Sequence, residues 1–301
     1  MIFPDLPLGQ LVTLRAGGSE LVCAPECGAR LLAYRVQGRD VLRPTSADAL
    51  RSPSAYGFAA FPLLPYSGPI FGGGFRFAGE WHPLARNVAA EPTATHGEGW
   101  IRPWRTEVAD NHALTLATDY APAAQAFPFA WRGQLQLSLA PGRLTIVITL
   151  INRDHRPMPA GLGLHPYFPK AAGTSLQFGC TGVWPPDAPE AVTSACAPLA
   201  DGLDFTAGRD VGPLVLDRCF EGWDGRASLT APDGFVTRIE ADEVFGKLQV
   251  YSAWDYPYVC VEPVTNANDG FNRAAHGVPG HAVAVLAPGR RLIGTITIGA
   301  D

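Results

Sequence analysis

Short runs that alternate between hydrophobic and polar residues recur along the chain, and glycine or proline bounds most of them. The clearest run covers residues 131–139, where Trp, Gly and three Leu occupy one face and Arg, two Gln and Ser occupy the other. Pro141-Gly142-Arg143 supplies a turn, and a β-branched run follows over residues 144–151. Two runs with a period of two and a short turn between them predict an antiparallel hairpin.

The same reasoning predicts strands elsewhere, at residues 11–14, 20–23, 30–36, 227–230, 235–240, 248–252 and 258–262. Pro232-Asp233-Gly234 predicts a tight turn between two of these runs. Residues 282–286 and 291–298 flank Pro288-Gly289-Arg290, and we expect them to form a last hairpin. Signals for helices are confined to short segments at residues 47–56 and 266–272.

These patterns favour an all-β fold. No amphipathic segment of helical length alternates with the strands, which argues against a parallel βαβ architecture. The 33 Gly and 28 Pro residues are spread along the chain and indicate many turns. Hydrophobic residues make up 47% of the chain, enough for a large core, and no linker or repeat divides it. We therefore predict one large antiparallel β-sandwich domain over residues 1–301, with few short helices.

Charge and composition exclude several classes of partner. The net charge is −5, only two lysines occur, and no basic patch stands out, so we expect no nucleic-acid binding. No apolar run approaches the roughly 20 residues of a membrane helix, and the first residues do not resemble a signal peptide. We expect a cytoplasmic protein, a monomer or homodimer, whose six cysteines stay reduced.

Two ionisable residues interrupt apolar runs. His165 stands in residues 161–169, which are otherwise apolar, and a core histidine with one hydrogen bond is the alternative interpretation. Glu262 ends the apolar run 258–261; a buried carboxylate is rare unless it is paired or functional, and the alternative is a carboxylate that already reaches solvent. A histidine and a glutamate held at strand ends suit proton transfer on a neutral substrate without a cofactor.

Other candidate residues give weaker signals. His96 lies in a glycine-rich turn where a ligand could approach the backbone closely. Asp217 ends another apolar run, either as a functional acid or as an ordinary loop cap. Several tryptophans lie near predicted loops and could stack on sugar rings, although most Trp side chains simply pack. Cys23 and Cys27 have no second pair at comparable spacing, which argues against a metal site.

Several blocks of sequence, taken in order, resemble the aldose 1-epimerase (galactose mutarotase) family. The resemblance extends from about residue 10 to residue 298. The blocks are residues 61–67, His96-Gly97 with Trp104, residues 161–168, residues 216–220 and residues 261–265.

This resemblance implies a galactose mutarotase-like β-sandwich that interconverts the α and β anomers of a free aldose without a metal or other cofactor. Glu262 would be the base that takes the proton of the anomeric hydroxyl, and His165 the acid that protonates the ring oxygen. Substrate-binding roles would fall to His96, Asp217 and Tyr167.

One block departs from the family pattern and leaves the substrate open. Family members continue from the serine with Asn-Arg-Ile, whereas this chain reads Ser67-Gly68-Pro69-Ile70. Arg76 is the candidate replacement for the missing arginine. A hexose-6-phosphate 1-epimerase is one alternative and would need a cationic rim from Arg76, Arg102, Arg105 or Arg132. A carbohydrate-binding module without catalytic activity on the same fold is the other.

Overall fold

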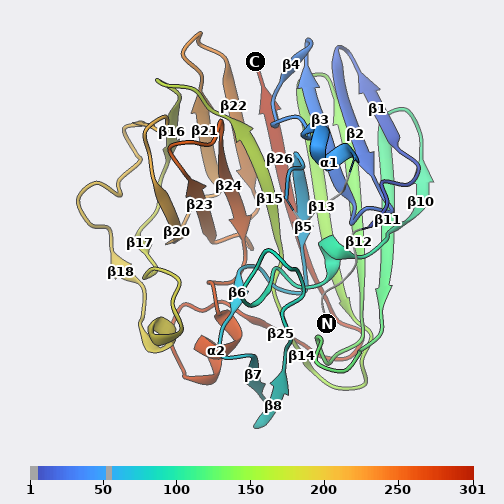
Figure 1. The fold of residues 1–301 in the computed structure, drawn as a ribbon, viewed down its shortest axis with the longest axis vertical. Coiled ribbons are helices and arrows are strands. Elements are labelled where there is room, and N and C mark those ends of the chain that lie inside the picture. Colours follow the sequence, from blue (N-terminus) through green and yellow to red (C-terminus); the bar gives the residue numbers. More distant parts are fainter. Residues whose placement is uncertain (1–5, 52–55) are drawn as a thin grey trace.

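The computed structural model describes residues 6–51 and 56–301 and contains two large antiparallel sheets (Figure 1). The larger sheet has 11 strands in the order β1-β2-β3-β5-β15-β24-β23-β20-β17-β18, and β4 pairs with β3. Its strands are β1 (Val12–Ala16), β2 (Ser19–Ala24), β3 (Arg30–Val36), β4 (Arg39–Asp40), β5 (Ala60–Leu63), β15 (Gly163–Pro169), β17 (Gly182–Val183), β18 (Ala197–Pro198), β20 (Leu216–Glu221), β23 (Lys247–Ser252) and β24 (Tyr258–Val264).

The second sheet has nine strands in the order β10-β11-β12-β13-β26-β22-β21-β16-β19. They are β10 (Arg105–Ala109), β11 (Ala113–Tyr120), β12 (Trp131–Ala140), β13 (Arg143–Asn152), β16 (Ser175–Phe178), β19 (Arg209–Asp210), β21 (Arg226–Thr230), β22 (Val236–Ala241) and β26 (Arg291–Ala300). The predicted all-β fold class is therefore confirmed.

Most of the smaller elements gather below the long strands in Figure 1, whereas one short helix, residues 47–51, lies in the upper part beside β3. Three two-stranded pairs join β6 (Pro69–Ile70) to β9 (Ala94–Thr95), β7 (Gly74–Phe77) to β8 (Glu80–Pro83), and β14 (Met158–Ala160) to β25 (Ala284–Leu286). The helical elements are α1 (Ala47–Arg51), α2 (Gly270–Ala275) and the 3₁₀ turns η1 (Gly99–Ile101) and η2 (Pro189–Thr193). Within the described ranges, no helix is long and apolar enough to cross a membrane.

Most strand predictions hold, and one hairpin prediction is wrong. β12 pairs with β13 and β21 pairs with β22, as the two turns predicted. β25 and β26 do not pair with each other: β25 pairs with β14, and β26 lies between β13 and β22. The ten-residue β26 can pair along nearly the whole of β13, which satisfies far more backbone groups than the three-residue β25 could.

Each expected helical segment contains a helix in the described part of the chain, and the second helix differs in its bounds. α1 ends at Arg51, and residues 52–55 of the expected segment lie outside the described residues. α2 begins at Gly270, four positions later than expected, because Asp269 has a left-handed backbone, with φ of 52°, which a right-handed helix cannot include.

The main core lies between the two sheets. It contains Ile146 and Ile298 of the nine-stranded sheet together with Phe220 and Val261 of the larger one. Strand alternation sends neighbouring side chains to opposite faces. Val259 and Val261 of β24 therefore join this core, whereas Cys260, Glu262 and Val264 face the other side of the sheet. That outer face is also covered, which explains why β24 reads as apolar throughout.

Candidate active site

Strand register brings the two predicted catalytic residues together. His165 of β15 pairs with Phe61 of β5. On its other side, the pairs Gly163–Val264 and Tyr167–Cys260 set His165 opposite Glu262 of β24, which in turn pairs with Gln249 of β23. Phe61, His165, Glu262 and Gln249 thus form one row across four neighbouring strands on the outer face of the larger sheet.

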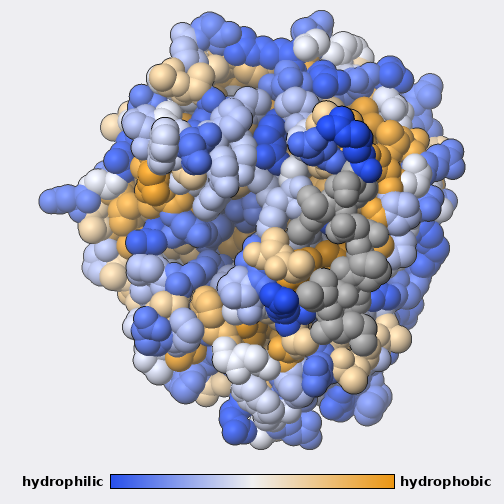
Figure 2. Space-filling model, in the orientation of Figure 1, coloured by the Kyte–Doolittle hydropathy of each residue, from blue (hydrophilic) through white to orange (hydrophobic). Residues whose placement is uncertain are grey.

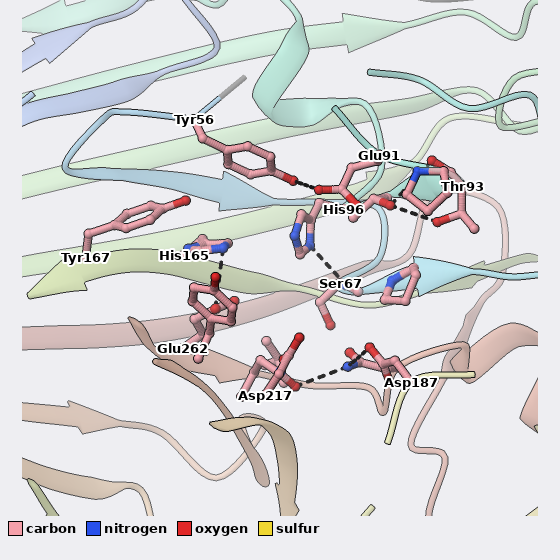
Figure 3. Close-up of a pocket in the computed structure, with 18 of the residues that line it drawn as sticks. Tyr56, Ser67, Glu91, Thr93, His96, His165, Tyr167, Asp187, Asp217 and Glu262 are labelled. Atoms are coloured by element: carbon pink, nitrogen blue, oxygen red, sulfur yellow. Dashed lines mark hydrogen bonds and ion pairs between the residues drawn. The ribbon is translucent and has the colours of Figure 1, made fainter. Parts of the chain in front are cut away.

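A cavity of about 490 Å³ opens over this row. Figure 2 shows the surface hollowed near the middle of this face, within a mostly hydrophilic rim. The lining includes five tyrosines (Tyr56, Tyr167, Tyr251, Tyr256 and Tyr258), four carboxylates (Glu91, Asp187, Asp217 and Glu262), and the hydroxyls of Ser67, Thr93 and Thr95. Figure 3 shows His165, Glu262 and His96 pointing into this space from different elements.

The His165 and Glu262 side chains form a close, buried pair. Nε2 of His165 lies 3.4 Å from Oε1 of Glu262, and the two side chains are only 10% and 3% exposed. Burial raises the pKa of Glu262 well above its usual range, and nearby Asp217 raises it further. Burial also lowers the pKa of His165 well below its ordinary value, and His96 and Arg43 act in the same direction. The site therefore favours uncharged forms of both partners, with one proton available between them.

The imidazole of His165 is held by aromatic packing. Its ring stacks on Tyr167 with centroids 4.6 Å apart, and it lies 4.7 Å from the Phe61 ring. Arg43 lies behind Tyr167, with its guanidinium 4.1 Å from that ring and its Nη2 donating to the carbonyl of Phe58. Nδ1 of His165 is buried and has no hydrogen-bond partner among the described residues, so Glu262, which faces Nε2, is the neighbour that can set the tautomer.

His96 is a neutral hydrogen-bond donor at the edge of the cavity. Its Nδ1 accepts a hydrogen bond of 3.1 Å from the backbone N–H of Gly68, which leaves the ring proton on Nε2. Burial lowers the pKa of His96 to about 3, so the ring stays uncharged at neutral pH. The backbone of His96 is left-handed, with φ of 63°, an uncommon conformation for a residue with a side chain. The turn also requires Gly97, where a Cβ would lie 2.3 Å from the carbonyl oxygen of Leu64.

Asp217 and Asp187 lie on the far wall of the cavity and are joined through two amides. Gln249 Nε2 donates to Asp217 at 2.6 Å, and Asn268 Nδ2 donates to Asp187 at 2.8 Å and to Gln249 Oε1 at 3.1 Å. Desolvation raises the pKa of Asp217. Asp187 keeps contact with solvent, and desolvation by the surrounding wall, aided by Asp217, raises its pKa to about 6. Both carboxylates can accept hydrogen bonds from the hydroxyl groups of a ligand.

The structure brings five of the six predicted site residues to one cavity, namely His96, His165, Tyr167, Asp217 and Glu262. It does not bring Arg76 there. Alternation on the hairpin β7–β8 exposes Arg76, whose guanidinium lies 5.9 Å from the Trp81 ring. The expectation that Arg76 contacts a substrate therefore gains no support from its position.

Sequence reasoning missed several residues of the lining. Gln249 and Tyr251 alternate on β23 with Leu248 and Val250, and that pattern could have placed both on one face of a strand. Asp187 follows two prolines in a loop and gave no recognisable signal. The tryptophans suggested for sugar stacking do not line the cavity in the described part of the chain, where tyrosines take that position.

Among the described residues, one group of side chains could hold a metal ion. His165, Cys260 and Glu262 are all buried, and their ligand atoms lie within 4.8 Å of one another. Zinc bonds of about 2.0–2.3 Å would require these atoms to lie roughly 3.5 Å apart. A soft divalent cation bound there would take the place of the proton that His165 and Glu262 share. The prediction that the protein needs no metal stays a prediction.

Comparison with known proteins gives a consistent result. A family model described as aldose 1-epimerase matches residues 10–299. The uncharacterized protein YphB of Escherichia coli K12 is 25% identical over 262 residues, which covers 83% of this chain and 84% of YphB.

Solved structures share the architecture. The crystal structure of a candidate aldose 1-epimerase from E. coli K12 has a TM-score of 0.85 at 23% identity and covers 97% of this chain and 99% of that one. The structure of a galactose 1-epimerase from Lactobacillus acidophilus NCFM has a TM-score of 0.76 at 16% identity and covers 97% of this chain and 94% of that one. At these identities the two structures establish the fold alone. Because the family model extends over nearly the whole sequence, this chain belongs to the aldose 1-epimerase family.

Proposed function

We propose that this protein is an aldose 1-epimerase that interconverts the α and β anomers of a free, unphosphorylated aldose. The observation that carries the proposal is the pair formed by His165 and Glu262, with nitrogen and oxygen 3.4 Å apart in a buried cavity. In a cyclic hemiacetal, the ring oxygen and the anomeric hydroxyl oxygen are bonded to the same carbon. The distance between these two oxygens is shorter than the 3.4 Å between Nε2 of His165 and Oε1 of Glu262. One group of the pair can therefore reach the ring oxygen while the other reaches the anomeric hydroxyl.

The proposed reaction moves two protons and breaks one bond. Glu262, as carboxylate, takes the proton of the anomeric hydroxyl, while His165, as imidazolium, donates a proton to the ring oxygen. The bond between C1 and the ring oxygen breaks as the C1 carbonyl forms, and the open chain rotates about C1–C2. In reclosure, His165 takes the proton back from the newly formed hydroxyl and Glu262 returns its proton to O1, which now lies on the other face.

The electrostatics of the site suit this cycle. Burial favours the uncharged forms of both groups, so the free site carries its single proton on Glu262. Transfer of that proton to His165 gives the carboxylate and imidazolium that open the ring, without uptake from solvent. Ring opening then restores the uncharged pair, which the buried site favours while the open chain rotates. Positioned proton transfer of this kind contributes about 10²- to 10⁴-fold to a rate.

The charges around the cavity support an unphosphorylated substrate. None of the described residues that line it is arginine or lysine, whereas four are carboxylates. The arginines considered for a cationic rim have other partners. Arg105 and Arg132 pair with Glu107 and Asp119 on the nine-stranded sheet, and Arg102 lies 5.0 Å from the Tyr120 ring. A phosphate would enter a cavity that offers it no cationic side chain from these residues.

The buried pair also argues against a module that only binds sugar. Hydroxyl recognition needs donors and acceptors, which His96 and Asp217 supply, but it does not need a buried Glu262 whose ionisation is opposed by its surroundings. Such a group lowers the stability of the fold, so a buried carboxyl with a strongly perturbed pKa in a cavity is a candidate for a functional proton.

The test is the rate at which freshly dissolved pure anomers reach equilibrium, followed by polarimetry on several aldoses. We expect the rate to rise in proportion to the concentration of wild-type protein for at least one neutral aldose, and Glu262→Gln to remove the effect. If every sugar relaxes at the buffer rate while calorimetry shows that one of them binds, the non-catalytic module is the correct interpretation.

A further inference from the structure

The loop after β5 leaves one position of the cavity wall without a side chain. Gly68 has φ of 74°, and a Cβ there would lie 2.2 Å from Oδ1 of Asn268. Asn268 is 7% exposed and lines the cavity. Its amide therefore fills the space that a side chain at position 68 would need, at the point where the sequence departs from the Asn-Arg pattern.

Asn268 belongs to a hydrogen-bonded row of four side chains. It donates one N–H to Asp187 and the other to Gln249, and Gln249 donates to Asp217. Because a carboxylate only accepts hydrogen bonds, this order fixes the orientation of both amides. Residues from β20, β23, the loop after β17 and the loop before α2 are held together in this way (Figure 3).

The row leaves acceptors free for a ligand. Across residues 6–51 and 56–301, no hydrogen bond reaches Oδ1 of Asp187 or Oδ2 of Asp217, and both residues line the cavity. A pKa of about 6 keeps Asp187 largely ionised at neutral pH. Arg273, whose charge favours the ionised form of Asp187, has its guanidinium bonded to the carbonyls of Asn268 and Ser194 and does not line the cavity. This end of the cavity thus offers negative charge and hydrogen-bond acceptors.

We propose that Asp187, positioned by Asn268, is a specificity-determining residue. Its carboxylate accepts a hydrogen bond from a sugar hydroxyl remote from the anomeric carbon, and its charge disfavours the binding of anionic sugars. Asp187 then takes the place of the missing Asn-Arg pair, with an acceptor where the family pattern provides donors. This inference rests on the proposed epimerase function and narrows its substrate class. Sugars with free hydroxyls and no acidic group fit this wall, whereas uronic acids and sugar phosphates meet like charge.

The first test compares Asp187→Asn with Glu190→Gln, which removes the same charge from the neighbouring exposed turn η2 without touching the cavity. A hydrogen bond to a charged group is worth about 10- to 100-fold in affinity. We expect Asp187→Asn to raise KM for a neutral aldose by roughly that factor with little change in kcat. We also expect Asp187→Asn to lower the ratio of kcat/KM for glucose to that for glucose 6-phosphate or glucuronic acid by about 10-fold or more. Glu190→Gln should behave as wild type.

The second test uses Asn268→Ala, which keeps both carboxylates and removes the amide that positions Asp187. We expect a rise in KM close to that of Asp187→Asn, and the double variant should be no worse than either single variant. Thermal unfolding of each variant shows that the fold is retained.

The outcomes separate this inference from the proposed function. One outcome is that wild type accelerates anomer exchange of a neutral aldose while Asp187→Asn keeps the wild-type KM and selectivity. That result would show that Asp187 does not determine specificity, and the epimerase proposal would stand. A wild-type preference for glucose 6-phosphate over glucose would overturn the inference as well. If wild type accelerates anomer exchange of no sugar, the epimerase proposal fails. In that case calorimetry can still support the role of Asp187 in recognition, if Asp187→Asn weakens sugar binding and Glu190→Gln does not.

Discussion

The substitution Glu262→Gln should lower activity and raise stability in the same protein. The Gln side chain has nearly the same shape, so the contacts of Glu262 with the row of His165 and Gln249 are retained. It cannot take a proton from the anomeric hydroxyl. We expect kcat to fall by about 10²- to 10⁴-fold, which corresponds to roughly 3–5 kcal/mol of lost transition-state stabilisation.

The effect on stability follows from linkage. The carboxyl of Glu262 ionises near pH 4.3 in the unfolded chain, but burial raises its pKa well above that in the folded protein. As pH rises through this window, the unfolded state loses a proton that the folded state keeps. The free energy of unfolding of wild type therefore falls, by about 1.4 kcal/mol for each unit of difference between the two pKa values. Glu262→Gln does not suffer this loss, so its advantage grows with pH.

The assay combines urea unfolding between pH 4 and pH 8 with polarimetry of a fresh anomer. Glu243→Gln is the matched control, since Glu243 is exposed and lies outside the cavity. We expect the free energies of unfolding of wild type and Glu262→Gln to diverge as pH increases, while the control follows wild type. A stability difference that does not change with pH would show that the carboxyl is not held uncharged. Full activity in Glu262→Gln would refute its role as base.

Three further predictions address the rest of the site. Burial lowers the pKa of His165, so the midpoint of the acid limb of kcat/KM against pH should lie below about 6.5. A midpoint above that value would show that the pKa of His165 is not lowered in the site. Nitrogen NMR should show His96 as the Nε2–H tautomer without titration between pH 5 and pH 8; a midpoint within that range would mean that the hydrogen bond from Gly68 is not maintained. Asn266→Ala should lower the free energy of unfolding by about 2–4 kcal/mol in urea, since it removes the buried bonds that Asn266 makes with Ser67, and a loss below about 1 kcal/mol would show that water replaces them.

The fold was largely predictable because alternation and turn residues are local signals. The run 131–151 shows a period of two on both sides of a Pro-Gly turn, and it forms β12 and β13 as expected. The partners of β25 and β26 were not predictable in this way. Which strand lies beside β26 depends on pairing with β13 and β22, more than 50 residues away in the sequence, and no local pattern reports it.

The site was predictable where a polar residue interrupts an apolar strand. His165 and Glu262 were prominent because both faces of their strands are buried, one against the core and the other beneath the cavity. Asp187 and Asn268 lie in loops, where polar residues are ordinary and carry no such contrast. The resemblance to a family did not point to them either, because neither residue lies in one of the matching blocks of sequence.

The most direct test of the central claim is anomer exchange measured by NMR saturation transfer on glucose and galactose with wild-type protein, His165→Gln and Glu262→Gln. The account predicts that wild type exchanges at least one neutral aldose faster than buffer, in proportion to protein concentration. It also predicts that both variants still bind that sugar but lose the acceleration. Exchange at the buffer rate for all aldoses with wild type, or undiminished exchange in either variant, would contradict it.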